Sequence, residues 1–339
     1  MSDRTEERPA VTSDLPPETL QVPRPGAPGP SGTPVTPVTP VVARLDDEHD
    51  AVTFLWHGPA REVRVLAGRL RPDGADALLE RAPGLWSRTF RVRRGWRASY
   101  RLQVDGAQVA DPLNPRLWRG FSIAETTPSS PWLVPGRRRH RLVREPAGFR
   151  YEPALPPVGS LVALDGEEWT EDLPVILDNL IAARRIPPVR AWLVESGPER
   201  TARLTCDPGF VDALPHDGFT VIAGQSLGGL TAVYAAHRHP GRFAAAVSQS
   251  GSFWWPDGPE PEWLTGELAR GPAPRAHLQL GSLEDDDMHG PTERLRAVLG
   301  AAADYREFEG GHDRYCWRDR LGDALIAAFA GLGGATSGG

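Results

Sequence analysis

Hydrophobic and polar positions follow different patterns in the two halves of the chain. Between about residue 50 and residue 113, short segments rich in β-forming residues alternate with turns. The segments are AVTFLWHG (51–58), REVRVLAGRL (61–70), LWSRTFRV (85–92) and ASYRLQVDG (98–106), and GADALLER (74–81) is the one helical segment expected among them. This pattern predicts a small all-β, immunoglobulin-like sandwich domain.

After residue 157 apolar runs alternate with amphipathic helical patterns. The predicted strands span 158–164, 189–195, 219–223, 244–248 and 276–280, and the predicted helices span 171–184, 226–238, 260–269, 291–301 and 315–331. Apolar strands that alternate with helices are typical of a mostly parallel sheet covered on both faces. The second half therefore predicts an α/β domain.

The 339 residues are enough for two domains, each with its own core. The predicted organisation is a disordered Pro/Gly/Thr-rich arm (1–42), a β-sandwich (43–143), a proline-rich linker (144–157), a catalytic domain (158–332) and a flexible tail (333–339). Residues 41–157 carry a net charge of +7 and residues 158–339 a net charge of −11. Because the basic region has no recognition motif, no nucleic-acid partner is expected.

The sequence also bears on the compartment and on cofactors. Its first residues, MSDRTEERPA, are charged, and no apolar run is long enough to cross a membrane. We therefore expect a cytoplasmic protein without membrane contacts. Cys206 and Cys316 have neither C-x-x-C nor metal-ligand spacing, so neither a metal nor another cofactor is expected.

A glycine-flanked serine lies between a predicted strand and a predicted helix. The segment VIAGQSLGGLTAVYAA (221–236) contains the pattern G-x-S-x-G around Ser226. In α/β-hydrolases this pattern forms a strained strand-to-helix turn that exposes a nucleophilic hydroxyl. The motif alone is weak in a chain with 36 glycines, but the strand before it and the helix after it supply the expected context. Ser226 is therefore the predicted nucleophile.

The general base should follow the nucleophile and the acid in chain order. GGHDRYCW (310–317) places His312 between a strand-like segment and the last helix, where this fold carries its base. We predict that His312 is the base, with His289 as the weaker alternative. Neither His237 nor His239 is expected to take part, because both lie at the end of the helix after the serine.

The acid is expected directly after the strand AHLQL. GSLEDDDMHG (281–290) offers four acidic side chains, and most of them need no role beyond a solvated loop. One of them would orient the imidazole and stabilise its charged form. Glu284 is the predicted acid and Asp286 the second choice, ahead of Asp285 and Asp287.

Two backbone N–H groups are needed for an oxyanion hole. One is expected from Leu227, the residue after the nucleophile, and the other from the loop LDGEEW that follows the first long strand. In that loop we predict Gly166, with Glu167 as the alternative donor and Trp169 closing the loop.

The combination of these segments resembles the enterochelin esterase (ferric enterobactin esterase) family of α/β-hydrolases. VTFLWHG, LWSRTFRV, YRLQVDG and DPLNP resemble its N-terminal β-sandwich, and LDGEEW, VIAGQSLGGLTAVYAA, SQSGSFWW and YREFEGGHDRYCWRDRL its catalytic domain. The resemblance covers roughly residues 50–330. It implies hydrolysis of the ester bonds of an iron-loaded catecholate siderophore lactone, with release of iron inside the cell.

The resemblance also suggests substrate contacts. Arg200 matches a family position near the cleft and is expected to pair with catecholate oxygens. Trp254 and Trp255 are expected to stack on the catechol rings. The alternative for these residues is structural, because tryptophans after a buried strand often belong to the core and an arginine often makes a surface ion pair.

Two departures from the family pattern stand out. GFVDALPHDGFTVIAG (209–224) leaves no room for the full helix that the family has before the nucleophile strand. We therefore expect uncovered apolar surface there, and with it either a self-associating protein, a homo-oligomer, or one less stable than a homologue that has the full helix. Arg203 stands where the family typically has glutamate. Two other functions stay open: a carbohydrate or feruloyl esterase, and a homologue that binds a siderophore without cleaving it.

Overall fold

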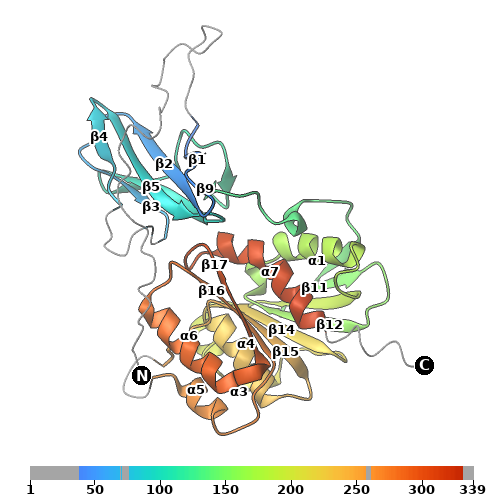
Figure 1. Cartoon of the computed structure of the whole chain (residues 1–339). Coiled ribbons are helices and arrows are strands. Elements are labelled where there is room, and N and C mark those ends of the chain that lie inside the picture. The colour runs from blue at the N-terminus through green and yellow to red at the C-terminus, as the bar shows by residue number, and fades with distance from the viewer. Residues whose placement is uncertain (1–37, 69, 71–75, 257–260, 331–339) are drawn as a thin grey trace. The chain divides into compact units, whose positions relative to one another are not determined.

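A computed structural model describes residues 38–68, 70, 76–256 and 261–330, which fall into two compact units (Figure 1). Unit 1 comprises Met1–Pro128 and the segment Glu309–Cys316. Unit 2 comprises Ser129–Phe308 and Trp317–Gly339. The predicted arm lies outside the described residues over 1–37, and the predicted tail lies outside them entirely.

Unit 1 contains two mainly antiparallel sheets, as predicted. The first has the order β1-β2-β5-β4, with bounds Val41–Arg44, His49–His57, Leu85–Arg93 and Leu79–Ala82. The second has the order β3-β6-β9-β8, with bounds Val63–Leu66, Arg97–Val104, Phe121–Glu125 and Leu117–Trp118, and β7 (Ala107–Val109) pairs with β6. Phe54 on β2 meets Tyr100 on β6 edge-to-face, with ring centroids 4.9 Å apart. The sheets therefore pack face to face as a sandwich.

Two predictions for unit 1 are wrong. The helix expected at 74–81 is absent from its described part, because Leu79–Ala82 forms β4 and pairs with β5. The predicted arm also extends too far, since Val41–Arg44 forms β1 and pairs with β2. In both cases pairing with the next strand along the chain outweighs the local sequence preference.

The DPLNP segment of unit 1 has a structural role. The buried Asp111 carboxylate accepts hydrogen bonds from the Tyr100 hydroxyl (2.7 Å) and from Thr39. Asn114 donates from its amide to the Tyr100 hydroxyl (3.0 Å) and to the carbonyl of Ile123 (2.9 Å). The buried side chains of Asp111, Asn114 and Tyr100 thus have hydrogen-bond partners, and these bonds fix the turn against the second sheet.

Unit 2 is built on an eight-stranded sheet with the order β10-β11-β13-β12-β14-β15-β16-β17. Strands β12 to β17 are parallel, and β10 and β11 run antiparallel. Their bounds are His140–Glu145, Gly148–Pro153, Gly159–Leu164, Val189–Val194, Thr220–Gln225, Phe243–Gln249, Ala276–Gly281 and Ala303–Phe308 for β10 to β17 in chain order. The α/β prediction is confirmed, and the catalytic half has an α/β-hydrolase fold.

Helices cover both faces of this sheet (Figure 1). On one face lie α4 (Leu227–Arg238), α5 (Trp263–Leu268) and α6 (Asp286–Leu299), and on the other lie α1 (Asp172–Ala182) and α7 (Arg314–Phe329). Val162 and Leu164 of β12 share a buried cluster with Leu230 of α4. Because successive strand residues point to opposite faces and both faces are covered, β12, β14 and β16 are buried throughout. No helix of the described segments is long and apolar enough to cross a bilayer.

The predicted linker 144–157 is wrong over most of its length. Strands β10 and β11 form an antiparallel hairpin, and β11 continues the sheet by pairing with β13. Gly148 has φ 141°, and a Cβ there would lie 2.0 Å from the carbonyl oxygen of Leu193. Only glycine fits this close approach. The prolines that suggested a linker lie at the turn and at the strand end, where a missing N–H is tolerated.

The prediction of an uncovered apolar face is also wrong. Between β13 and β14 the chain forms only two short helices, α2 (Arg200–Arg203) and α3 (Pro208–Asp212). However, Leu204, Val211 and Leu214 beside them are buried in the cluster that contains the central strands. These three side chains replace the missing helix, so the structural reason for expecting self-association does not hold.

Candidate active site

Ser226 occupies a sharp turn between β14 and α4. Its backbone has φ 56° and ψ −122°, a conformation that non-glycine residues adopt only under strain. The Ser226 N–H donates to the carbonyl of Gln249 (3.0 Å), and its own carbonyl accepts from the N–H groups of Leu230 and Ser252 (both 3.1 Å). Both backbone groups are satisfied, so the surrounding fold holds the strained turn in place.

The neighbouring glycines are required by close backbone contacts. A Cβ at Gly224 would lie 2.2 Å from the carbonyl oxygen of Gly228, and one at Gly229 would lie 2.5 Å from the Ser248 hydroxyl. No side chain fits at either position. Of the two glycines in G-x-S-x-G, Gly224 is therefore required by the space around it, whereas a Cβ at Gly228 would make only ordinary contacts, the nearest at 3.5 Å.

Two backbone donors are available in this region. Neither Leu227, the first residue of α4, nor Gly166, the first residue of the 3-10 helix η3 (Gly166–Glu168), donates its N–H to another described residue. A Cβ at Gly166 would lie 2.1 Å from the carbonyl carbon of Leu193, so this position also requires glycine. The loops approach each other, because a Cβ at Gly228 would lie 3.5 Å from an Asp165 carboxylate oxygen.

Arg200 braces the η3 loop. Its Nε and Nη2 each lie 2.7 Å from a different oxygen of Asp165, in a bidentate ion pair. The hydrogen bond to Asp165 raises the pKa of the Arg200 guanidinium, while burial opposes the shift. Asp165 is buried and has φ 53°, so the pair fixes a left-handed residue directly before Gly166. The sequence analysis expected Arg200 to pair with catecholate oxygens or else to make a surface ion pair, and it did not indicate the buried Asp165 as the partner.

Of the four predicted acids, Glu284 has the most buried side chain. Its Oε1 accepts hydrogen bonds from the Ser250 hydroxyl (2.5 Å) and the Gly281 N–H (2.9 Å). The Trp317 indole donates in turn to the Ser250 hydroxyl (2.8 Å). Asp286 and Asp287 are exposed in the first turn of α6. The Glu284 carboxylate is thus oriented by two donors to its Oε1.

A row of glutamines lies at the carboxyl ends of the three central strands. Gln225, Gln249 and Gln279 occupy neighbouring register positions on β14, β15 and β16. Gln225 donates to Gln249 (3.0 Å), Gln249 donates to Gln279 (2.8 Å), and the Trp169 indole donates to Gln225 (3.0 Å). This buried network ties the nucleophile strand to its neighbours. The sequence signal was glutamine at matching positions in consecutive apolar strands.

The two candidate bases lie in different environments. His312 is exposed in the Glu309–Cys316 segment of unit 1, between β17 and α7. His289 is buried on α6, with Nδ1 3.9 Å from a Glu307 carboxylate oxygen. An exposed imidazole is accessible to a substrate, which favours His312.

The two predicted aromatic contacts differ in packing. Trp255 packs against the apolar cluster of unit 2 and meets Trp263 edge-to-face, with ring centroids 6.2 Å apart. Trp254 is half-buried, and its carbonyl accepts a hydrogen bond from the Glu262 N–H (3.2 Å). Substrate stacking stays a prediction for both, and core packing accounts for much of Trp255.

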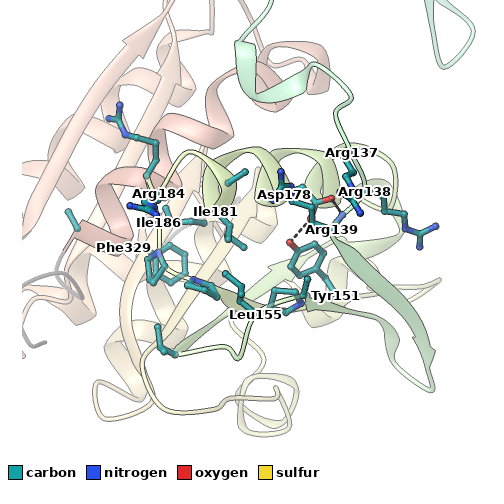
Figure 2. A pocket seen from close by; sticks show the side chains of 18 residues that line it. Arg137, Arg138, Arg139, Tyr151, Leu155, Asp178, Ile181, Arg184, Ile186 and Phe329 are labelled. Carbon is teal, nitrogen blue, oxygen red and sulfur yellow. Dashed lines mark hydrogen bonds between the residues drawn. The ribbon is translucent and has the colours of Figure 1, made fainter.

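A pocket of about 990 Å³ lies at the opposite edge of the sheet, near the start of β12 and β13 (Figure 2). Arginines line it at positions 137–139, 184 and 185, and Leu155 and Ile181 add apolar surface. Tyr151 donates to Asp178 at 2.9 Å, and His140 lies 2.8 Å from the same carboxylate. Because Ser226 follows the carboxyl end of β14, this pocket belongs to a different edge from the nucleophile.

The described residues contain no group of three or more histidine, cysteine, aspartate or glutamate side chains able to hold a metal ion. The Ser226 hydroxyl lies 3.3 Å from the Ser252 hydroxyl, and the same unit contains the N–H groups of Leu227 and Gly166 and the oriented Glu284 carboxylate.

Comparison with known proteins shows similarity to esterases. Residues 211–328, which include the serine turn, match the esterase family model described as "Putative esterase". An iron(III) enterobactin esterase of Escherichia coli is 29% identical and covers 84% of this chain and 92% of its own. An iron(III) enterobactin esterase from Dickeya dadantii is 28% identical, and the match covers 81% of this chain and 86% of the relative. This chain is a homologue of the iron(III) enterobactin esterases.

Solved structures of these esterases share the fold of this homologue. The enterobactin esterase from Shigella flexneri, crystallised in the presence of enterobactin, is 26% identical with a TM-score of 0.74. The match covers 87% of this chain and 96% of that chain. The likeness spans both the β-rich N-terminal region and the α/β region, and it supports a carboxylic ester hydrolase.

Proposed function

We propose that this protein is a serine esterase that hydrolyses the ester bonds of a ferric catecholate siderophore trilactone and so releases the iron. The carrying observation is Ser226, which has φ 56° in a turn between β14 and α4 where the preceding Gly224 has no room for a Cβ. Its substrate class is supported by relatives named iron(III) enterobactin esterase and by a related structure obtained with enterobactin. The iron is cargo of the substrate.

In the proposed mechanism His312 removes the proton of the Ser226 hydroxyl, which attacks the ester carbonyl. The Leu227 and Gly166 N–H groups stabilise the oxyanion of the tetrahedral intermediate. The C–O bond of the ester then breaks, the alkoxide takes the proton from His312 as the lactone ring opens, and the opened chain remains bound to Ser226 as an acyl-enzyme. His312 then activates a water molecule that releases the acyl group as a carboxylic acid and regenerates Ser226.

Glu284 is the proposed partner of the imidazole. It would hold His312 in the productive tautomer and stabilise the imidazolium. The support is its burial and its two hydrogen-bond donors, Ser250 and Gly281, which fix the carboxylate orientation. Asp286 is the alternative, although it lies exposed on α6.

Substrate contacts are proposed for Arg200, Trp254 and Trp255. The Arg200 Nη1 makes no hydrogen bond to a described residue and is available for a catecholate oxygen, while Nε and Nη2 hold Asp165. The half-buried Trp254 is better placed for stacking than Trp255, which packs against Trp263. We place the reaction in the cytoplasm, which suits two free and buried cysteines.

A substrate panel tests this function. The full chain is incubated with iron-loaded and iron-free catecholate trilactones and with a feruloyl ester, and the products are identified by mass spectrometry. We expect linear catecholate-serine esters from the trilactones and no such products with Ser226→Ala. Cleavage of the feruloyl ester alone would favour the carbohydrate-esterase function, and tight trilactone binding without cleavage would favour a binding protein.

A further inference from the structure

The segment that carries His312 belongs to the N-terminal β unit, although it joins two elements of the catalytic sheet region in sequence. Residues Glu309–Cys316 group with unit 1, while β17 before them and most of α7 after them group with unit 2. Within unit 1, the segment Glu309–Cys316 makes several hydrogen bonds with strand β6.

The segment lies along the first residues of strand β6. Strand β3 pairs with β6 over Arg101–Val104, and Glu309–Cys316 contacts Arg97 and Ser99. The Arg97 N–H donates to the carbonyl of Glu309 (3.3 Å), and the Cys316 thiol donates to the carbonyl of Arg97 (3.3 Å).

The tightest contact is made by the residue next to His312. One oxygen of Asp313 accepts the backbone N–H of Ser99 at 2.6 Å, and the other accepts the Ser99 hydroxyl at 3.0 Å. The second oxygen also accepts the Tyr315 N–H (2.8 Å) and thereby caps α7. A single carboxylate thus joins β6, the His312 backbone and the start of the last helix.

Further contacts hold the same segment. The Tyr315 hydroxyl donates to Glu125 of β9 at 2.9 Å, and the Tyr315 ring lies 5.7 Å from the Trp118 ring, measured between centroids. A Cβ at Gly310 would lie 2.5 Å from the Cys316 sulfur, so the chain before His312 is also closely packed.

We propose that Ser99 and Asp313 are positioning residues for the base, so that strand β6 of the N-terminal unit sets the orientation of His312. This inference rests on the proposed function, in which His312 activates Ser226. Because Asp313 is bonded through the peptide to His312, a movement of its carboxylate moves the imidazole. Displacement of a catalytic group by about 1 Å can lower turnover by about 100-fold.

The ionisation of Asp313 is consistent with a geometric role. Burial raises the pKa of its carboxyl above the ordinary value, and hydrogen bonds from Ser99 and Tyr315 oppose that shift. A raised pKa in the folded state means that ionisation at neutral pH disfavours folding. The carboxylate charge therefore gives no net stability at this site, and its hydrogen bonds fix the segment.

The test compares Asp313→Asn with Asp105→Asn in the full chain. Asp105 is a matched control, because it also accepts two backbone N–H groups within unit 1, those of Arg61 and Glu62. The measurements are kcat and KM on a trilactone, the melting temperature, and the rate at which a fluorophosphonate labels Ser226. For Asp313→Asn we expect a 10- to 100-fold loss of kcat and of labelling rate, with KM within twofold of wild type. Asp105→Asn should match wild type in kcat, in KM and in the labelling rate.

A second pair of variants covers the case in which Asp313→Asn fails to fold. Ser99→Ala removes the hydroxyl bond and should lower kcat by less than Asp313→Asn, because the Ser99 N–H bond remains. Ser99→Thr keeps a hydroxyl and should restore turnover. Equal kinetics for Asp313→Asn and Asp105→Asn, or for Ser99→Ala and Ser99→Thr, would overturn the proposal.

Failure of the proposed function gives a different result. If wild type labels at Ser226 but cleaves no trilactone, the labelling rates still decide the role of Asp313, and only the substrate assignment fails. If His312→Ala labels as fast as wild type, His312 is not the base, and the proposed function and this inference fall together.

Discussion

The Ser250 hydroxyl donates a hydrogen bond of 2.5 Å to Oε1 of Glu284, and the Gly281 N–H donates to the same oxygen at 2.9 Å. Both donors lie at the carboxyl ends of β15 and β16 or directly after them. Residues at the ends of the parallel strands therefore orient the Glu284 carboxylate without any contribution from a histidine. A carboxylate prepared in this way is suited to hold an imidazole in one tautomer.

The first prediction follows from this orientation. Glu284→Gln keeps the shape but removes the charge that stabilises an imidazolium, and it should lower kcat by about 10⁴-fold. Asp286→Asn is the matched control, because Asp286 is exposed on α6, and its kcat should stay near that of wild type. Steady-state kinetics on one trilactone decides between them. A silent Glu284→Gln with an impaired Asp286→Asn would move the acid two residues along the chain.

The second prediction concerns backbone strain at the nucleophile. Ser226 has φ 56°, which glycine adopts at little cost and alanine does not. Ser226→Gly and Ser226→Ala should both be inactive, but the glycine variant should unfold with a free energy about 1–3 kcal/mol larger than the alanine variant. Urea denaturation monitored by tryptophan fluorescence measures the difference. Equal stabilities would show that the turn is not strained.

The third prediction compares the ion pair of Arg200 with Asp165 to an ion pair at the protein surface. Arg200→Lys keeps the charge but cannot form both bonds to Asp165, so the η3 loop loosens and the free Nη1 is lost. We expect kcat to fall and KM to rise. Arg238→Lys is the control, because Arg238 makes a similar bidentate pair with the exposed Asp212 (2.8 and 2.9 Å), and it should leave both constants unchanged. Identical kinetics for the two variants would contradict both roles of Arg200.

The fourth prediction concerns stability at acid pH. Burial lowers the pKa of His277 below its usual 6.5, and Arg275 and Arg306 add to this, while the hydrogen bond with Asp304 opposes it. The unfolded chain therefore takes up a proton first as the pH falls. Stability from neutral His277 is present above about pH 6.5 and is lost below it, through the folded-state pKa.

His277→Gln tests that linkage. Between pH 7 and pH 5 its melting temperature should decline less steeply than that of wild type, as measured by differential scanning calorimetry. His237→Gln, at an exposed position near the end of α4, should reproduce the wild-type slope. A parallel decline in wild type and His277→Gln would show that His277 does not contribute to the acid sensitivity.

Local signals were enough to predict the serine turn and the parallel strands. The turn around Ser226 follows Gly224, which has no room for a Cβ, and β12 to β16 are rich in apolar residues, so neighbouring residues carry the information. The four-acid loop was narrowed to Glu284 by position after a strand, and the structure adds the burial and the donors that favour it.

What the sequence did not reveal depends on contacts between distant residues. The hairpin of β10 and β11 looked like a linker because its prolines are conspicuous and its partner, β13, lies some 40 residues away along the chain. Leu204, Val211 and Leu214 cover the sheet from short helical turns and the loops beside them, so a search for the periodicity of a long helix overlooks them. The contact of Asp313 with Ser99 spans 214 positions, and no local pattern indicates it.

The most direct test of the central claim is detection of the acyl-enzyme. Wild-type protein is mixed with excess iron-loaded catecholate trilactone, quenched within one turnover, digested and analysed by tandem mass spectrometry. We predict a catecholate-serine acyl group on the Ser226 hydroxyl, formed as fast as the first product and absent from Ser226→Ala. Turnover with no adduct on Ser226, undiminished in Ser226→Ala, would contradict the account.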